Sequence, residues 1–311
     1  MCIVSYLLKK KIQSKMPSRQ EGSPYLKVLT VDDFENLKST PFSFYSKKLK
    51  LNGFKYYYQR DSYKGLVIFF HGAGNGHLAY TREINALAEA SYLVYAYDNS
   101  CCGSSEGENF WNFSQSLVDQ KYFFEYLETD EEAKGLKRFA IGHSWGGFTA
   151  MASLANKNYK VEKVVEFSGF RSVLQVFLSN SPESKGISWL LKIMNWRYFG
   201  KLGNLDTLKV LKKTDKKVML IHGDLDEVVS YEKVFLEFKG ELKDNENITF
   251  VVSHNRHHQP YFSLDAQNYY LDLISKGVLE GKLGKDYNID YFKLTEEDPE
   301  IMGQVFKFLN E

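Results

Sequence analysis

The heptapeptide IGHSWGG at residues 141–147 constrains the fold of this chain more than any other feature. It matches G-x-S-x-G, and it lies between residues 138–142, which are typical of a buried strand, and a helical pattern that begins near Gly146. A turn this sharp forces the serine backbone into a strained conformation, and the glycines on either side avoid clashes. The pattern predicts a serine hydroxyl raised above the end of a sheet, at the N-terminus of a helix.

Apolar segments of strand length alternate with longer amphipathic segments, which is the pattern of helical crossovers onto a parallel sheet. We therefore predict an α/β fold with a mostly parallel central sheet and flanking helices. The expected buried strands are residues 66–70, 92–97, 138–142, 161–167, 218–221 and 248–252, and the expected helices are residues 80–90, residues 116–127, one beginning near Gly146, and a terminal one that buries Ile301, Val305, Phe306 and Leu309.

The first pair of strands is expected to differ from the others. Asn52-Gly53 is a strong signal for a type I′ turn, and residues 47–51 and 54–58 flank it. The sheet is therefore predicted to open with an antiparallel ribbon that turns at these two residues.

The interval 170–214 contains no convincing strand, and a loop of that length in a compact domain is usually functional or has its own structure. Residues 188–196 are apolar on more than one helical face. We interpret the interval as a small helical lid inserted between two strands, with an ordinary crossover carrying extra helices as the alternative. The expected organisation is an N-terminal extension (1–45), the first part of the core (46–169), the lid (170–214) and the second part of the core (215–311).

The composition excludes several classes of partner. Forty basic and thirty-nine acidic side chains leave a net charge of +1, which offers no footprint for nucleic acid. No segment approaches the roughly 20 apolar residues needed to span a bilayer. Three cysteines, with Cys101 and Cys102 adjacent, form no disulfide framework. The N-terminus has its apolar run before its charges, unlike a signal peptide, so we expect a cytoplasmic protein.

With these features the chain resembles the α/β-hydrolase family, in its serine-hydrolase branch. The resemblance runs from about Lys47 to the C-terminal helix and includes FHGAG at residues 70–74 and YDN at residues 97–99. It implies Ser144 as the nucleophile, with backbone N–H groups of Ala73 and Trp145 as the oxyanion hole. The residues around Ala73, which are His71, Gly72 and Gly74, are implied to border the substrate.

The loop after residues 97–99 departs from the family pattern, because Cys101 stands where many relatives have the first glycine of a G-x-G-x-S turn. Substrate contacts from this loop are therefore left open. Cys101 and Cys102 are weak alternatives to Ser144 as nucleophile. Neither lies on a strand-to-helix turn, and a free cysteine is usually a small apolar residue.

The serine needs a base and an orienting acid. The segment HGDLDEVV at residues 222–229 follows an expected strand, and relatives carry the acid three residues after this glycine. The resemblance therefore implies Asp226, with Asp224 and Glu227 as local rivals. A carboxylate here is also suited to capping a helix that begins near Ser230. We expect His222 to close the end of the strand rather than to take part in the chemistry.

Three histidines lie in SHNRHHQP at residues 253–260, after the last expected strand, where this family carries its base. The cluster has poor metal-ligand geometry and no nearby cysteine or paired carboxylates, so we predict no metal ion. Some relatives have His-Asn-Pro here, and His258-Gln259-Pro260 fits that pattern. The resemblance implies His258 as the base, with His257 second and His254 third.

A set of serine, histidine and aspartate with two N–H donors performs acyl transfer. The resemblance favours hydrolysis of a small-molecule carboxylic ester without a cofactor, and Trp189 and Trp196 in the expected lid suggest an apolar acyl or aromatic group. Three alternatives remain: a serine aminopeptidase, an acyltransferase and a non-catalytic binding protein. For the aminopeptidase, Glu183 is the candidate residue that would bind the substrate amine. A homodimer is compatible with the sequence.

Overall fold

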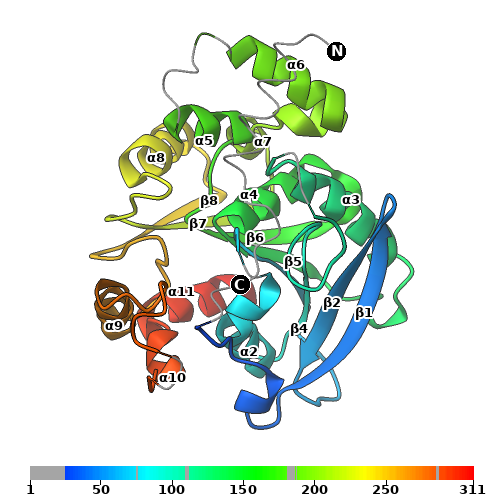
Figure 1. The fold of residues 1–311 in the computed structure, drawn as a ribbon. Coiled ribbons are helices and arrows are strands. Elements are labelled where there is room, and N and C mark those ends of the chain that lie inside the picture. The colour runs from blue at the N-terminus through cyan, green and yellow to red at the C-terminus, as the bar shows by residue number, and fades with distance from the viewer. Residues whose placement is uncertain (1–24, 75, 109–111, 181–185, 187, 285–286) are drawn as a thin grey trace.

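The computed structural model describes residues 25–74, 76–108, 112–180, 186, 188–284 and 287–311. Within these ranges the centre of the molecule is an eight-stranded sheet with the order β1-β2-β4-β3-β5-β6-β7-β8 (Figure 1). β1 pairs antiparallel with β2, and β2 pairs antiparallel with β4. The remaining neighbours are parallel. The predicted mostly parallel α/β sheet with an antiparallel opening is therefore confirmed.

The strands are β1 (Lys38–Ser46), β2 (Leu49–Tyr57), β3 (Leu66–Phe70), β4 (Leu93–Tyr97), β5 (Arg138–His143), β6 (Val161–Phe167), β7 (Lys217–Gly223) and β8 (Ile248–Ser253). The α-helices are α2 (Thr81–Glu89), α3 (Gln115–Leu127), α4 (Trp145–Ala152), α5 (Val173–Asn180), α6 (Ser188–Phe199), α7 (Thr207–Leu211), α8 (Leu236–Leu242), α9 (Leu264–Ser275), α10 (Tyr291–Leu294) and α11 (Pro299–Asn310). Shorter helical turns are η1 (Val31–Asp33), η2 (His77–Tyr80), η3 (Glu131–Ala133), η4 (Ser153–Ala155), η5 (Lys157–Tyr159), η7 (Gly200–Asn204) and η8 (Tyr231–Phe235).

Both faces of the central strands are buried. Along β3, Leu66, Ile68 and Phe70 belong to the core under α3, α4, α7 and α8, whereas Val67 and Phe69 belong to the core under α2 and α11. Successive side chains of a strand point to opposite faces, so a strand covered on both sides is apolar at every position. This is why β3 and β4 appear in the sequence as continuous apolar runs. The sheet lies between two layers of helices (Figure 1).

The position predicted for the first turn is wrong. The ribbon turns at residues 47–48, where Lys47 has φ 56°, and Asn52-Gly53 lies inside β2. A Cβ on Gly53 would lie 2.5 Å from the backbone oxygen of Ala96 and 2.7 Å from Cζ of Phe42. The glycine thus allows β2 to approach β4 closely rather than forming a turn. The sheet also begins earlier than expected, at Lys38, within the segment assigned to an N-terminal extension.

Four helical elements, α5, α6, η7 and α7, lie between β6 and β7, and no strand interrupts them in the described parts of residues 170–214. Leu191 and Met194 of α6 pack against Leu174 and Phe177 of α5 in a small apolar cluster of their own. In Figure 1, α5 and α6 lie at the top of the view, above α4 and the sheet. The interval therefore forms a helical insertion with its own small core.

Three acidic side chains, those of Glu83, Glu166 and Glu297, each have one buried carboxyl oxygen without a hydrogen-bond partner among the described residues. Glu83 lies on α2 and Glu297 just before α11. Burial raises the pKa of Glu83 to about 8. Burial and then the charge of Glu83 raise the pKa of Glu297 well above its ordinary value. The folded protein therefore holds protons that the unfolded chain releases at lower pH.

This proton uptake predicts that the free energy of unfolding falls as the pH rises from about 4.5 to about 8. For one such group the slope is at most about 1.4 kcal/mol per pH unit, and Glu83→Gln should make it shallower because the amide does not ionise. Urea denaturation between pH 5 and pH 8.5 measures the slope. Glu89→Gln, at an exposed position of the same helix, is the control. Parallel profiles for wild type and Glu83→Gln would contradict the prediction.

Candidate active site

Ser144 lies on a strained turn between β5 and α4. Its backbone has φ 56° and ψ −116°, and its N–H donates to the backbone oxygen of Phe167 over 2.8 Å. A Cβ on Gly142 would lie 2.2 Å from the oxygen of Gly146, and one on Gly146 would lie 1.9 Å from the oxygen of Phe70. Only glycine fits at these two positions, which is the steric reason for the predicted motif. The strand–turn–helix context predicted for Ser144 is therefore present.

His258 and Asp226 are joined by a hydrogen bond. Nδ1–H of His258 donates to Oδ2 of Asp226 over 2.9 Å, and the backbone N–H groups of Val228 and Val229 both donate to Oδ1 over 2.9 Å. The Asp226 side chain is fully buried. Burial alone would raise the pKa of Asp226, but hydrogen bonds from His222 and His258 hold it well below its ordinary value. Asp226 is therefore a buried anion that faces His258.

The neighbouring acids and histidines pair differently. His254 is exposed, and its Nδ1 lies 2.9 Å from Oδ2 of Asp224, whose Oδ1 accepts the N–H of Asn255. Glu227 is exposed. The backbone N–H of His257 donates to Oε1 of Gln267 over 2.7 Å. Among the rival residues, the structure thus brings Asp226 together with His258, and Asp224 with His254.

His143, the residue before Ser144, connects the turn to the segment that carries His258. Its Nε2–H donates to the backbone oxygen of His258 over 2.7 Å, and its Nδ1 accepts from the Tyr80 hydroxyl over 2.9 Å. The Tyr80 oxygen in turn accepts the N–H of Gly72 over 3.0 Å. Burial lowers the pKa of His143 to about 3, so the ring is neutral and can accept as well as donate.

This chain of bonds holds the three predicted segments of the site together, although sequence reasoning identified neither Tyr80 nor His143 as a site residue. The imidazoles of His143 and His258 lie 4.7 Å apart, which places the His258 ring beside the serine turn. The only local signal in the sequence is a polar residue at the variable position of the serine motif. The contact with Tyr80, 63 residues away, has no such signal.

The two predicted oxyanion-hole residues lie on different segments of the chain. Trp145 is the first residue of α4, and its side chain is buried with Nε1–H donating to the backbone oxygen of Phe113 over 2.7 Å. Ala73 is exposed in the loop after β3. His71 is buried beneath that loop, where its Nε2 accepts the N–H of Asn99 and its Nδ1 lies 2.6 Å from the oxygen of Gly72. His71 thus links the loop after β3 to the segment after β4 by hydrogen bonding.

The segment after β4 is closely packed. The carboxylate of Asp98 accepts bonds from the backbone and ring of His77 and from the backbone and hydroxyl of Ser104. Cys101 and Cys102 are buried in the main core, and Cys101 has φ 68°, a conformation that glycine adopts more easily. This packing fits the interpretation of both cysteines as small apolar residues.

The structure does not bring the two predicted lid tryptophans to Ser144 by any described contact. Trp189 and Trp196 of α6 are each 62% exposed, because α6 packs its opposite face, with Leu191 and Met194, against α5. Glu183, the candidate amine-binding residue of an aminopeptidase, lies outside the described residues. The role of the tryptophans in substrate binding stays a prediction.

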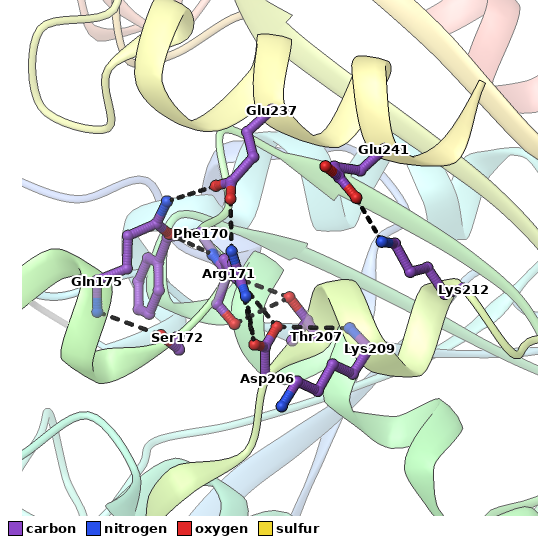
Figure 2. Close-up of polar contacts among 10 residues, drawn as sticks. All are labelled: Phe170, Arg171, Ser172, Gln175, Asp206, Thr207, Lys209, Lys212, Glu237 and Glu241. Carbon is purple, nitrogen blue, oxygen red and sulfur yellow. Dashed lines mark hydrogen bonds and ion pairs between the residues drawn. The ribbon is translucent and has the colours of Figure 1, made fainter. Parts of the chain in front are cut away.

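A polar cluster around Arg171 ties the two ends of the insertion together (Figure 2). Arg171 precedes α5, and its guanidinium forms a fork with the carboxylate of Asp206, at distances of 2.8–3.0 Å, just before α7. The same guanidinium also bonds Glu237 on α8, which accepts from Gln175 as well. The backbone oxygen of Arg171 accepts from the N–H of Thr207. The cluster therefore anchors the neck of the insertion to the core.

Replacing Arg171 by methionine should lower the free energy of unfolding by about 1–2 kcal/mol, since it removes several charge-assisted hydrogen bonds from a side chain that is partly exposed. Urea denaturation measures the loss. Lys212→Met, which removes an exposed pair with Glu241 in the same region (Figure 2), is the control and should cost less. Equal losses for the two variants would show that the hydrogen bonds of Arg171 contribute no more to stability than the exposed pair does, which would contradict the prediction.

The described residues offer no group of three or more histidine, cysteine, aspartate or glutamate side chains that could hold a metal ion. Within the same ranges, no helix combines the length and the apolar character that crossing a bilayer requires.

Comparisons with known proteins agree with the fold. The family model described as serine aminopeptidase, S33 matches residues 61–201. The chain is similar to monoglyceride lipase from Rattus norvegicus, with 25% identity over 273 residues that cover 82% of this chain and 84% of the relative. It is 30% identical to monoglyceride lipase from Homo sapiens over 132 residues, which cover 42% of this chain and 41% of the relative.

Among solved structures, an esterase from Pyrococcus furiosus superposes with a TM-score of 0.59 at 20% identity, covering 86% of this chain and 98% of that chain. A likeness at this identity concerns the fold. Together with the sheet order, it shows that the chain has the α/β-hydrolase fold. The sequence matches to the S33 family model and to monoglyceride lipase support the serine-hydrolase branch of that fold.

Proposed function

We propose that this protein hydrolyses a carboxylic ester through an acyl-enzyme on Ser144, with His258 as the base and Asp226 as the acid that orients it. The observation that carries the proposal is the 2.9 Å bond from His258 Nδ1 to the buried Asp226 carboxylate, on a segment bonded through His143 to the serine turn. This bond leaves Nε2 of His258 to accept the serine proton.

In the first half-reaction, the hydroxyl oxygen of Ser144 attacks the ester carbonyl while His258 takes the hydroxyl proton. The carbonyl oxygen becomes an oxyanion, for which the backbone N–H groups of Ala73 and Trp145 are the proposed donors. The Asp226 carboxylate stabilises the imidazolium that forms. The tetrahedral intermediate then breaks its bond to the alkoxy oxygen, and the imidazolium gives its proton to the departing alcohol.

In the second half-reaction, a water molecule gives a proton to His258 as its oxygen attacks the acyl carbon on Ser144. Collapse of the second tetrahedral intermediate breaks the bond to the serine oxygen, which regains its proton from the imidazolium. The products are the carboxylic acid and the free enzyme. Gly72 and Gly74, which have no side chains, leave room for the substrate beside the loop.

The similarity to proteins named monoglyceride lipase supports an acylglycerol as the substrate class. The helical insertion, residues 170–214, is then the lid above the acyl chain, between the two parts of the core at residues 46–169 and 215–311. The family description that mentions an aminopeptidase leaves a peptide-bond substrate as the alternative to test.

A substrate panel tests the proposal. Wild type and Ser144→Ala should be compared on p-nitrophenyl esters of increasing chain length, on monoacylglycerols and on aminoacyl anilides. We expect Ser144-dependent release of the acid from esters and little release from anilides. Ser144-dependent cleavage of anilides with inert esters would replace the esterase by an aminopeptidase. No Ser144-dependent turnover of any member would contradict the catalytic proposal.

A further inference from the structure

We infer that His222 is a positioning residue for the acid, whose ring N–H fixes the Asp226 carboxylate in the orientation that receives His258. The inference rests on the proposed function and adds a residue to it. His222 is the penultimate residue of β7, and only about 1% of its surface is exposed. Its Nε2 lies 2.7 Å from the backbone oxygen of Val229 and 3.3 Å from Oδ2 of Asp226.

The donor role of His222 follows from its two neighbours. A backbone oxygen and a carboxylate oxygen can only accept hydrogen bonds, so Nε2 carries a hydrogen and points it between them. The hydrogen bond goes to Val229 at 2.7 Å, and Oδ2 of Asp226 lies beside it at 3.3 Å as an electrostatic contact. Asp226 Oδ2 thus faces two histidines, His222 and His258, from different strand ends.

These bonds close a small ring of contacts around the acid. His222 holds the carbonyl of Val229, and the N–H of the same Val229 donates to Oδ1 of Asp226. The N–H of Val228 donates to Oδ1 as well. With Oδ1 occupied by two backbone donors, Oδ2 is turned toward His222 and His258. The orientation of the carboxylate therefore depends on the turn at residues 224–229 keeping its shape.

The turn at residues 224–229 has few packing contacts of its own, because much of it faces solvent. Leu225 is 46% exposed and Val228 is 68% exposed, so few apolar contacts hold the turn in place. His222, by contrast, sits in the interior strand β7, paired with Val252 of β8. Its ring packs 5.4 Å from the ring of Phe235. A side chain on a rigid strand thus holds an exposed turn that carries the proposed acid.

Two substitutions separate the hydrogen bond from the packing of the ring. His222→Phe keeps an aromatic ring against Phe235 but has no N–H donor, whereas His222→Gln keeps an N–H donor near the position of Nε2 and loses the ring. We expect His222→Phe to lower kcat on a p-nitrophenyl ester by about 10-fold to 100-fold, with KM changed by less than about twofold. His222→Gln should keep kcat within about threefold of wild type.

The opposite pattern, with His222→Phe fully active and His222→Gln impaired, would overturn the inference in favour of ring packing. Thermal melts of each variant show whether it is folded. If His222→Phe does not fold, His222→Leu removes the donor without the larger ring and takes its place, with the same expected loss in kcat.

A double substitution tests whether His222 acts through Asp226. In an Asp226→Ala background, His222→Phe should have no further effect on kcat, because the carboxylate that it positions is absent. A full additional loss would overturn the inference. Wild type and Ser144→Ala are measured in the same ester-hydrolysis assay. Absence of Ser144-dependent hydrolysis would refute the proposed function itself, whereas normal wild-type hydrolysis with an active His222→Phe refutes only the role of His222.

Discussion

Replacing Ser144 by alanine is expected to lower kcat for ester hydrolysis by about 10⁴-fold or more. The substitution removes the atom that forms the acyl-enzyme, and any remaining turnover would come from water activated by the rest of the site. The turn at Ser144 is held by Gly142, Gly146 and the bond to Phe167, so the structure around it should survive. Steady-state kinetics with a p-nitrophenyl ester measure the effect.

The control for this substitution is Ser168→Ala. Ser168 is buried at the end of the neighbouring strand β6, and its hydroxyl has no hydrogen-bond partner among the described residues. It should retain kcat within about threefold of wild type, because it supplies no group to the proposed reaction. An active Ser144→Ala protein would contradict the assignment of the nucleophile.

The second large effect is expected at His258. His258→Ala removes the base that takes the serine proton, so kcat should again fall by about 10⁴-fold, with unchanged thermal stability as the sign of an intact fold. The structural reason for choosing His258 is its bond to Asp226, which His257 does not form in the described contacts. Kinetic measurements on the purified variants provide the check.

His257→Ala and His254→Ala are the matched controls, because both lie in the same segment. His254 pairs with Asp224 at the surface, and His257 contributes its backbone N–H to Gln267, which alanine preserves. Both variants should keep kcat within a few-fold of wild type. If His257→Ala were inactive and His258→Ala were active, the base would be one residue earlier than proposed.

Much of the fold can be predicted from the sequence because its central strands are buried on both faces. The stretch 66–70 is apolar throughout and the stretch 161–167 is apolar at four of its seven positions, and they form β3 and β6 with the expected bounds. The serine turn is equally predictable, since the clashes that Gly142 and Gly146 avoid are local to the motif. Local sequence is sufficient to predict a strand or turn when the contacts that determine it involve residues close to it in the chain.

Prediction fails where the cause lies far along the chain. Asn52-Gly53 has the composition of a turn, but Gly53 is required by its approach to Ala96, on β4. Tyr80 and His143 likewise have roles only because the fold brings η2, the serine turn and the His258 segment together. The exposure of Trp189 and Trp196 has no local signal either, because it depends on α6 directing its Leu191 face to α5.

Covalent labelling of Ser144 tests the central claim most directly. Wild-type protein should be treated with a fluorophosphonate, and the adduct located by mass spectrometry of the peptide that contains residues 141–147. We predict one phosphonyl group per chain on Ser144, no labelling of Ser144→Ala, and much slower labelling of His258→Ala and Asp226→Ala. Wild-type protein that stays unlabelled, or that carries the adduct on Cys101 or another residue, would contradict the proposed mechanism.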